Sequence, residues 1–280
     1  MTGTLYVCAT PIGNLEDITL RVLRVLKEVD LIAAEDTRHS GILLNHFEIH
    51  TPVTSYHEHN KYEKAEVLLD MLRKGKNIAL ITDAGTPAIS DPGEVLVARC
   101  RDCGIAVSSL PGACACITAL TMSGLPTRRF AFEAFLPADR KERRLVLEEL
   151  KEETRTMVIY EAPHHLKKTL AELLETLGDR RVTVCRELTK MHEEGLRETL
   201  REACAAYETE EPRGEYVLVI EGKSREEIAA NAAENYASLS LTEHMQKYLA
   251  QGMDRKDAMR CVAKDRGCSR REVYEGLLRE

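Results

Sequence analysis

Short apolar runs alternate along the chain with segments whose apolar residues recur at helical spacing. The runs at residues 4–9, 30–34, 77–81 and 105–109 each lead into a polar loop and then into a helix-like segment. Apolar runs of this length are typical of buried strands in a parallel sheet. The pattern therefore predicts a first α/β domain over residues 1–123.

A second set of strands and helices follows a hinge at residues 124–129, which contains Gly and Pro. The predicted strands cover residues 130–135, 156–160, 181–185 and 215–221, and the predicted helices cover residues 141–152 and 163–177. The segment between the last two strands has no clear period and is predicted to be irregular. These elements predict a second α/β domain over residues 124–223.

The C-terminal part has a different composition. Residues 224–240 are rich in Ala and Glu, which predicts a linker or a loose helix. Residues 238–280 are predicted to form a compact helical unit. In this unit, two helical segments flank a turn at residues 265–269, as in a helix-turn-helix, and Ser269 is predicted to cap the second helix.

The composition agrees with a globular α/β protein. Of 280 residues, 44% are hydrophobic and 30% are charged. No apolar run of about 18 residues is present, and the N-terminus lacks the pattern of a signal peptide. We therefore expect a cytoplasmic protein. The net charge of −7 excludes a uniformly basic surface, but a nucleic-acid partner needs only one basic face.

The nine cysteines and the histidines do not predict a metal site. Neither the CRDC pair at residues 100–103 nor the CAC pair at residues 114–116 has a second pair or a histidine at zinc-like spacing. His57 and His59 are two residues apart and lack a third ligand. For His57 we therefore expect a surface role or a role facing a substrate.

The loop TDAGTPAISDPG at residues 82–93 joins a buried strand to a helix and crowds Asp83 and Asp91 beside Gly and Pro. Ligands bind at the carboxyl ends of strands in open α/β sheets. The loop TPIGN, in which Asn14 is predicted to cap the next helix, occupies the same kind of position. Neither loop has the G-x-G-x-x-G or P-loop pattern, which argues against an ordinary dinucleotide or ATP fold.

Three further segments carry candidate chemistry. A polar cluster at residues 35–39 follows the second strand, and a loop with Pro111 and Gly112 precedes a helix that begins with small residues. The loop at residues 136–144 is basic, which suits contact with a phosphate backbone but is also typical of a solvated surface.

The segments TPIGNLEDIT, LIAAEDTRHS, TDAGTPAISDPG, LPGACACITAL, IYEAPHHL and CRELTK occur in this order. Together they resemble the small-subunit ribosomal RNA methyltransferase branch of the tetrapyrrole methylase superfamily, whose members depend on S-adenosylmethionine. The resemblance covers nearly the whole chain. It implies two α/β domains that face a cofactor cleft, a homodimer, and 2′-O-methylation of a cytidine ribose in the decoding region of 16S ribosomal RNA.

The resemblance also implies which residues hold the methyl donor. In the first domain these are Pro11, Gly13, Gly85, Thr86, Pro87, Ile89, Pro111, Gly112, Ala115 and Cys116. In the second domain they are Tyr160, Glu161, Gly214 and Glu215. No metal is implied.

Methyl transfer to a ribose hydroxyl needs in-line positioning and removal of a proton. Four carboxylates are candidates for the base: Glu35, Asp36, Asp83 and Glu187. The sequence does not choose among them, and transfer of the proton to water is the alternative. The candidate RNA contacts are Arg38, His57, Arg140, Lys141, Arg143, Arg144 and Arg186.

Two other functions fit parts of this pattern. A methyltransferase acting on a tetrapyrrole would use the same cleft, although AEDTR, SYHEHN and the helical tail favour RNA. A non-catalytic RNA-binding protein would keep the fold without the chemistry, although the intact donor loops argue against it.

Overall fold

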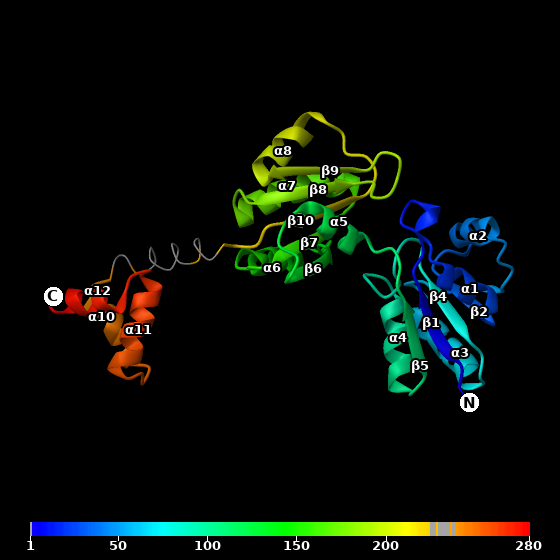
Figure 1. The fold of residues 1–280 in the computed structure, drawn as a ribbon, viewed down its shortest axis with the longest axis horizontal. Coiled ribbons are helices and arrows are strands. Elements are labelled where there is room, and N and C mark those ends of the chain that lie inside the picture. Colours follow the sequence, from blue (N-terminus) through cyan, green and yellow to red (C-terminus); the bar gives the residue numbers. More distant parts are fainter. Residues whose placement is uncertain (1, 225–227, 229–235, 237–238) are drawn as a thin grey trace. The chain divides into compact units, whose positions relative to one another are not determined.

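The structure is a computed structural model that describes residues 2–224, 228, 236 and 239–280 (Figure 1). The described residues divide into two units. The first comprises Met1–Glu148 and Thr156–Glu221 and contains both sheets, and the second comprises Glu149–Arg155 and Gly222–Glu280. Most of the predicted linker at residues 224–240 lies outside the described residues, so that prediction is not assessed.

The first sheet is entirely parallel and has the order β3-β2-β4-β1-β5. Its strands are β1 (Thr4–Cys8), β2 (Leu31–Ala34), β3 (Val53–Ser55), β4 (Ile78–Ile81) and β5 (Ala106–Leu110). Its helices are the 3-10 helix η1 (Leu15–Asp17), α1 (Leu20–Glu28), α2 (Thr37–His46), α3 (Lys61–Arg73) and α4 (Gly93–Asp102). The predicted strand–loop–helix alternation is confirmed.

Helices cover both faces of this sheet, and neighbouring residues of a strand point to opposite faces. In β4, Ile78 and Leu80 pack in one core with residues of α3 and α4. Ala79 and Ile81 pack in another core with residues of α1 and α2. This two-sided burial explains why β4 reads as a continuous apolar run.

The second sheet is mixed and has the order β6-β7-β10-β8-β9, with only β6 and β7 parallel. Its strands are β6 (Phe130–Phe135), β7 (Thr156–Glu161), β8 (Arg181–Arg186), β9 (Glu194–Thr199) and β10 (Tyr216–Ile220). The helices between these strands are α6 (Arg140–Lys151), α7 (Pro163–Leu177) and α8 (Leu200–Thr209).

Helix α5 (Ala115–Ser123) follows the first sheet in sequence but packs on the second. Its buried residues Cys116, Ala119 and Leu120 share a core with Val158 of β7 and Val217 of β10. The residues before α5 are therefore held close to β7 and β10.

The second unit contains α10 (Leu241–Leu249), α11 (Arg255–Asp265) and α12 (Arg270–Leu277), which pack around Met245, Val262 and Val273. These helices lie within residues 238–280, where the sequence predicts a helical unit. Ser269 caps α12 as predicted, since its hydroxyl accepts from Glu272 N and the Glu272 carboxylate accepts from Ser269 N. None of the described helices is both long and apolar enough to cross a bilayer.

One prediction about elements holds only in part, and another is wrong. Asn14 caps the next helix as predicted, but that helix is the short η1, and α1 begins after Thr19, whose hydroxyl accepts from Val22 N. The segment expected to be irregular between β8 and β10 contains strand β9 and helix α8.

Candidate functional site

A cavity of about 620 Å³ opens at the carboxyl ends of strands in the first unit. Glu35 after β2 and Asp83 after β4 line one part of it, and Ala115 begins α5 at its edge. Tyr160 of β7 and Tyr216 of β10 contribute from the second sheet. The volume lies within the range of about 300–1,000 Å³ that is typical of small-molecule sites.

Backbone contacts connect the three loops of the first sheet to one another. Gly85, with φ of 86°, pairs with Thr10 through Gly85 N to Thr10 O at 3.1 Å and Thr10 N to Gly85 O at 2.9 Å. The Thr86 hydroxyl donates to Ala113 O at 2.9 Å. The loops before η1, α4 and α5 therefore form one connected surface.

Asp91 organises the rest of the loop after β4. Its carboxylate accepts hydrogen bonds from Ala88 N at 3.0 Å, Ile89 N at 3.2 Å and Gly93 N at 2.7 Å. Ala88 and Ser90 both have φ of 65°, a left-handed conformation that costs energy in non-glycine residues. Burial raises the pKa of the Asp91 carboxyl, although these three amides oppose the rise.

The four candidate bases lie in different environments, and only two of them line the cavity. Glu35 accepts from the Thr82 hydroxyl at 2.6 Å, and Asp83 accepts from Asp36 N at 3.2 Å. Partial burial raises the pKa of Asp83, and the carboxylates of Glu35 and Asp36 raise it further. Asp36 instead caps α2 through Arg38 N at 2.8 Å, and this hydrogen bond lowers its pKa.

Glu187, the fourth candidate, does not line the cavity and is held by Lys190 and by the backbone of Glu215. Its carboxylate accepts from Lys190 Nζ at 2.8 Å and from Glu215 N at 3.0 Å. The Lys190 hydrogen bond lowers the pKa of Glu187. This arrangement stabilises the turn that leads to Glu215, which lines the cavity.

Gly214 allows the Glu187 side chain to lie close to the backbone, and replacing Gly214 with alanine is expected to destabilise the fold. Gly214 has φ of 82°, and a Cβ there would lie 2.6 Å from the carboxylate carbon of Glu187. Gly104, with φ of 67°, has no atom within 4 Å of its Cβ position and serves as the matched control. In urea unfolding, Gly104→Ala should cost about 1–2 kcal/mol and Gly214→Ala clearly more. Equal losses would show that Glu187 yields without cost.

Two side chains of the second sheet form part of the cavity wall. The Tyr160 hydroxyl accepts from Cys116 N at 3.0 Å, which ties β7 to α5. Glu161 is buried and accepts from Ala162 N at 2.8 Å and from the Thr169 hydroxyl. Thr169 in turn accepts from Arg143 at 2.6 Å, so a buried hydrogen-bonded chain supports Glu161.

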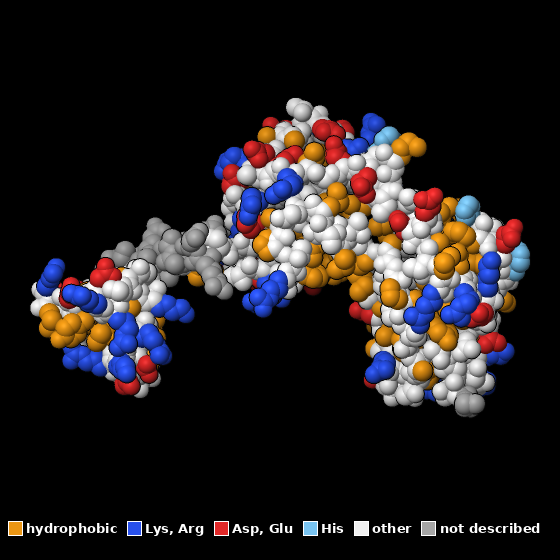
Figure 2. Space-filling model, in the orientation of Figure 1, with side chains coloured by type: hydrophobic (Ala, Val, Ile, Leu, Met, Phe, Trp, Pro, Cys, Tyr) orange, Lys and Arg blue, Asp and Glu red, His pale blue; other side chains and the backbone are white. Residues whose placement is uncertain are grey.

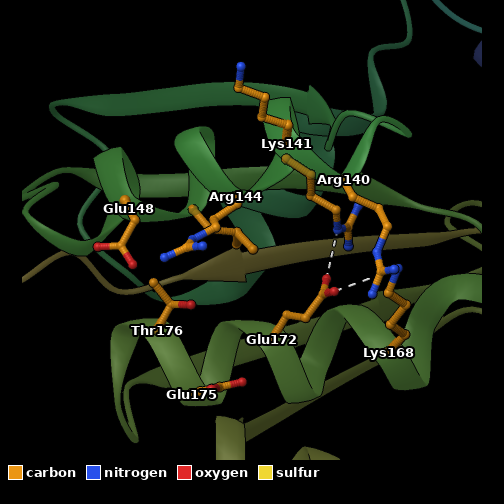
Figure 3. Close-up of a pocket in the computed structure, with 10 residues that line it drawn as sticks. Arg140, Lys141, Arg144, Glu148, Lys168, Glu172, Glu175 and Thr176 are labelled. Carbon is orange, nitrogen blue, oxygen red and sulfur yellow. Dashed lines mark hydrogen bonds and ion pairs between the residues drawn. The ribbon is translucent and has the colours of Figure 1, made fainter.

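A second hollow, of about 720 Å³, lies between α6 and α7 (Figure 3). Arg140 and Arg144 line it and are exposed, whereas Lys141 also lines it but points away from α7. Arg143 is buried and donates to Glu172 at 2.7 Å. The basic segment 136–144 therefore contains the start of α6 at Arg140, one residue before the predicted start of the helix, and Arg143 is already paired.

The structure brings together about half of the residues predicted for the donor and the base. Those lining the 620 Å³ cavity are Glu35, Asp83, Gly85, Thr86, Ile89, Ala115, Tyr160, Glu161 and Glu215. Pro11 and Gly13 line an adjacent pocket of about 260 Å³, which Asp83 also borders. The predicted residues that line neither are Asp36, Pro87, Pro111, Gly112, Cys116, Glu187 and Gly214.

Gly112 does not line the cavity but packs against a neighbouring loop. A Cβ on Gly112 would lie 2.5 Å from the Cβ of Ala9, so Gly112 allows two loops to pack closely.

Arg38 is exposed at the start of α2, and His57 precedes α3. Arg186 lies 3.6 Å from both Glu194 and Glu210. These three candidate RNA contacts do not line the cavity.

Sequence reasoning did not assign Phe135 to the site and did not single out Cys114 within the loop 111–116, although both line the cavity. Phe135 ends β6, is 56% exposed and meets Tyr160 edge to face at 5.6 Å. An aromatic residue at the end of a strand next to a polar loop was the available signal. Cys114 precedes α5 and belongs to the CAC pair, of which only Cys116 was named for the donor.

Comparison with known proteins shows the family to which the chain belongs. The sequence model of the family described as Tetrapyrrole (Corrin/Porphyrin) Methylases matches residues 4–204. A Halalkalibacterium halodurans protein named Ribosomal RNA small subunit methyltransferase I is 51% identical over 97% of this chain and 93% of its own length. A Synechocystis sp. protein of the same name is 48% identical over 98% of this chain and 96% of its own length.

Solved structures share the fold at low sequence identity. The crystal structure of uroporphyrin-III C-methyl transferase from Thermus thermophilus, complexed with S-adenosyl homocysteine, superposes with a TM-score of 0.53. The match covers 78% of this chain and 97% of that chain at 21% identity. This likeness concerns the fold alone and agrees with the predicted α/β class.

Proposed function

Because the chain belongs to the tetrapyrrole methylase family and to its small-subunit ribosomal RNA methyltransferase I branch, we propose that it methylates a ribose 2′-hydroxyl. The acceptor is a cytidine in the decoding region of 16S ribosomal RNA, and S-adenosylmethionine is the donor. The observation that carries this proposal is the identity of 51% over nearly the full length of a relative with that name.

The 620 Å³ cavity fits the donor in size and chemistry. Glu161 and Glu215 are among its lining residues, and acidic residues suit the cationic sulfonium and amino groups of S-adenosylmethionine, although Glu215 is also paired with Lys190. Gly85 brings backbone close to the space, and Ile89 and Phe135 add apolar surface for a flat base. When bound there, the donor supplies an activated methyl group, so the protein's main task is positioning.

Asp83 is the carboxylate best placed to accept the proton from the ribose hydroxyl. It lines the cavity, and its raised pKa strengthens it as a base, since proton affinity follows pKa. Asp36 and Glu187 are committed to a helix cap and to Lys190, and their pKa values are lowered. Glu35, beside Asp83, holds the Thr82 hydroxyl and so positions the loop.

RNA contact is proposed at two basic surfaces. The first is the groove between α6 and α7, where Arg140, Lys141 and Arg144 are exposed (Figure 3). The second is the helical unit 239–280, over which Figure 2 shows Lys and Arg side chains. Its exposed basic residues include Arg255, Lys256, Arg260, Arg270 and Arg271. Phosphate contacts of this kind provide affinity without reading sequence.

Replacing Arg140, Lys141 and Arg144 with alanine is expected to weaken RNA binding and reduce its salt dependence. Each lost phosphate contact lowers the slope of log K against log salt by about 0.7 for single-stranded RNA, so three lower it by about 2. Filter binding over a salt series measures the slope. Donor binding, followed by calorimetry, should stay unchanged because none of the three lines the donor cavity.

The matched control removes the same charge from exposed positions of the first sheet's helices. It replaces Lys27, Lys74 and Arg101 with alanine. A slope that falls equally in both variants would indicate a general charge effect, and an unchanged slope in the first variant would remove the groove from the RNA surface.

The methylation itself is tested with radiolabelled S-adenosylmethionine and small ribosomal subunits that lack the modification. Label recovered on the ribose of a 16S cytidine supports the proposal. Label on an added porphyrinoid but not on RNA would favour tetrapyrrole methylation, and no label on either would favour a non-catalytic RNA-binding protein.

Cytoplasmic location and a homodimer complete the proposal. A ribosomal RNA substrate supports the cytoplasmic location, the homodimer follows from the resemblance to the RNA methyltransferase branch, and both stay predictions. Sedimentation equilibrium of the purified chain measures the second, and a mass of one chain at micromolar concentration would contradict it.

A further inference from the structure

Two cysteine thiols meet at the start of α5, beside the donor cavity. Cys114 and Cys116 have their sulfur atoms 3.4 Å apart. Cys114 is half-buried and lines the cavity, whereas Cys116 is 5% exposed beneath it. The backbone of Cys116 is fixed by its amide, which donates to the Tyr160 hydroxyl. This geometry holds the two sulfurs in contact within one turn of chain.

The Cys114 thiol differs from the buried thiols of the molecule. The hydrogen bond from Cys116 lowers the pKa of Cys114 to about 6, helped by the amides of Ile117 and Cys116 and opposed by burial. Burial raises the pKa of Cys8 and Cys185 to about 12. The lowered pKa favours the thiolate of Cys114, which is the reactive form of cysteine.

We propose that Cys114 and Cys116 form a redox modification site, in which a peroxide converts the two thiols into a disulfide at the edge of the cavity. The disulfide itself does not depend on the proposed methyl transfer. Only its effect on donor binding rests on that function.

The reaction balances with one peroxide. The Cys114 thiolate attacks one peroxide oxygen, so that an S–O bond forms, the O–O bond breaks and hydroxide leaves. The Cys116 sulfur then attacks the sulfur of the sulfenic acid, so that the S–S bond forms and the S–O bond breaks. The proton of Cys116 leaves with the oxygen as water. Both sulfurs are oxidised, and both peroxide oxygens are reduced to water.

Closing the bond changes the cavity wall. A disulfide needs a sulfur separation of about 2.05 Å, whereas the thiols lie 3.4 Å apart. Cys116 is buried in the core with Ala119 and Val217, whereas Cys114 packs at the edge of that core and is half-buried. Closing the bond should therefore shift mainly the Cys114 side chain, which lines the cavity. We therefore expect the oxidised protein to bind the donor more weakly.

The test maps the disulfide in the full-length protein. Trypsin leaves Cys103, Cys114 and Cys116 on one peptide, so the experiment uses a Cys103→Ser background. After treatment with equimolar hydrogen peroxide at neutral pH, this peptide should be lighter by two hydrogen atoms, and dithiothreitol should restore its mass. In a Cys103→Ser/Cys116→Ser control the disulfide cannot form, and dimedone should trap Cys114 as sulfenic acid. An unchanged peptide, or earlier oxidation at Cys261 or Cys268, would overturn the proposal.

Calorimetry of S-adenosylmethionine binding tests the consequence separately. The peroxide-treated Cys103→Ser protein should bind at least about tenfold more weakly than the untreated protein, and dithiothreitol should reverse the loss. A mapped disulfide with unchanged donor affinity would refute the effect on the cavity. Absence of binding in the reduced protein would instead contradict the proposed function, while the mass measurement would still decide the disulfide.

Discussion

Replacing Asp83 with asparagine is expected to lower kcat for ribose methylation by about 10²–10⁴-fold, the usual contribution of a positioned general base. Asparagine keeps an oxygen that can accept from Asp36 N, which Asp83 now accepts at 3.2 Å. The loop should therefore keep its conformation while losing the group that takes the proton. Single-turnover rates with small ribosomal subunits measure the effect, and calorimetry should show donor affinity close to that of the wild type.

The pH dependence of this variant separates a base from a structural residue. Partial burial raises the pKa of Asp83, so the wild-type rate should fall as pH drops through that raised value, because the protonated carboxyl cannot accept a proton. The limb assigned to Asp83 should be absent in Asp83→Asn. The stability of the fold depends on pH in the opposite direction. Because the pKa of Asp83 is higher in the folded state than in the unfolded state, this group stabilises the fold at pH values below the unfolded-state pKa. That contribution is lost as the pH rises through the folded-state pKa. At neutral pH Asp83→Asn should therefore be at least as stable as the wild type.

Two neighbouring carboxylates provide the comparison. Asp36→Asn should lose less activity, because asparagine caps a helix about as well as aspartate. Glu35→Gln tests the other carboxylate that lines the cavity. If Glu35→Gln lost the acid limb of the pH profile and Asp83→Asn kept it, the assignment of the base to Asp83 would be wrong.

The sequence predicted those elements that carry a strong local signal. The bounds of β6 and α7 agree with their expected ranges, since α7 has Pro163 at its first turn and Gly178 directly after its end. Strand β4 was predicted from its continuous apolar run, and all four of its residues are buried. In each case residues close together in the sequence specify either the burial of both faces or the ends of the helix.

Strand β9 was missed because its partner, rather than its composition, makes it a strand. None of the residues of its sequence EGLRET is buried, and it lies at the sheet edge, where β8 is its one partner strand in the described part of the chain. Helix α8 did carry a signal, because Thr199 and Glu202 form a capping box. The T-x-x-E spacing would have placed the start of α8 within the segment expected to be irregular.

The candidate site was predicted as a set of loops but not as a set of facing side chains. Asp36 and Asp83 lie 47 positions apart in the chain, and only the register of β2 against β4 decides which of them turns to the cavity. Glu187 was taken for a site carboxylate because the Lys190 contact depends on a turn that the sequence does not reveal. Side-chain direction at a loop is a tertiary property.

Replacing Ala115 with phenylalanine is expected to abolish most of the binding of S-adenosylmethionine. Ala115 lines the 620 Å³ cavity at the first turn of α5, so a ring at this position would occupy space needed by the donor. Overfilling a packed site typically costs about 1–3 kcal/mol, which corresponds to a loss of roughly tenfold or more in affinity. Calorimetry with S-adenosylmethionine measures the loss, and the rate of methylation should fall with it at low donor concentration.

The same substitution at an exposed helix position controls for the residue type. Ala205 of α8 is exposed and does not line the cavity, so Ala205→Phe should bind the donor like the wild type. Ala115 is only half-buried, so thermal unfolding of Ala115→Phe should differ from that of the control by a small amount. A well-folded Ala115→Phe protein with full donor affinity would place the donor elsewhere. The pocket of about 260 Å³ at Pro11 and Gly13 would then be the next site to block, since Asp83 borders it as well.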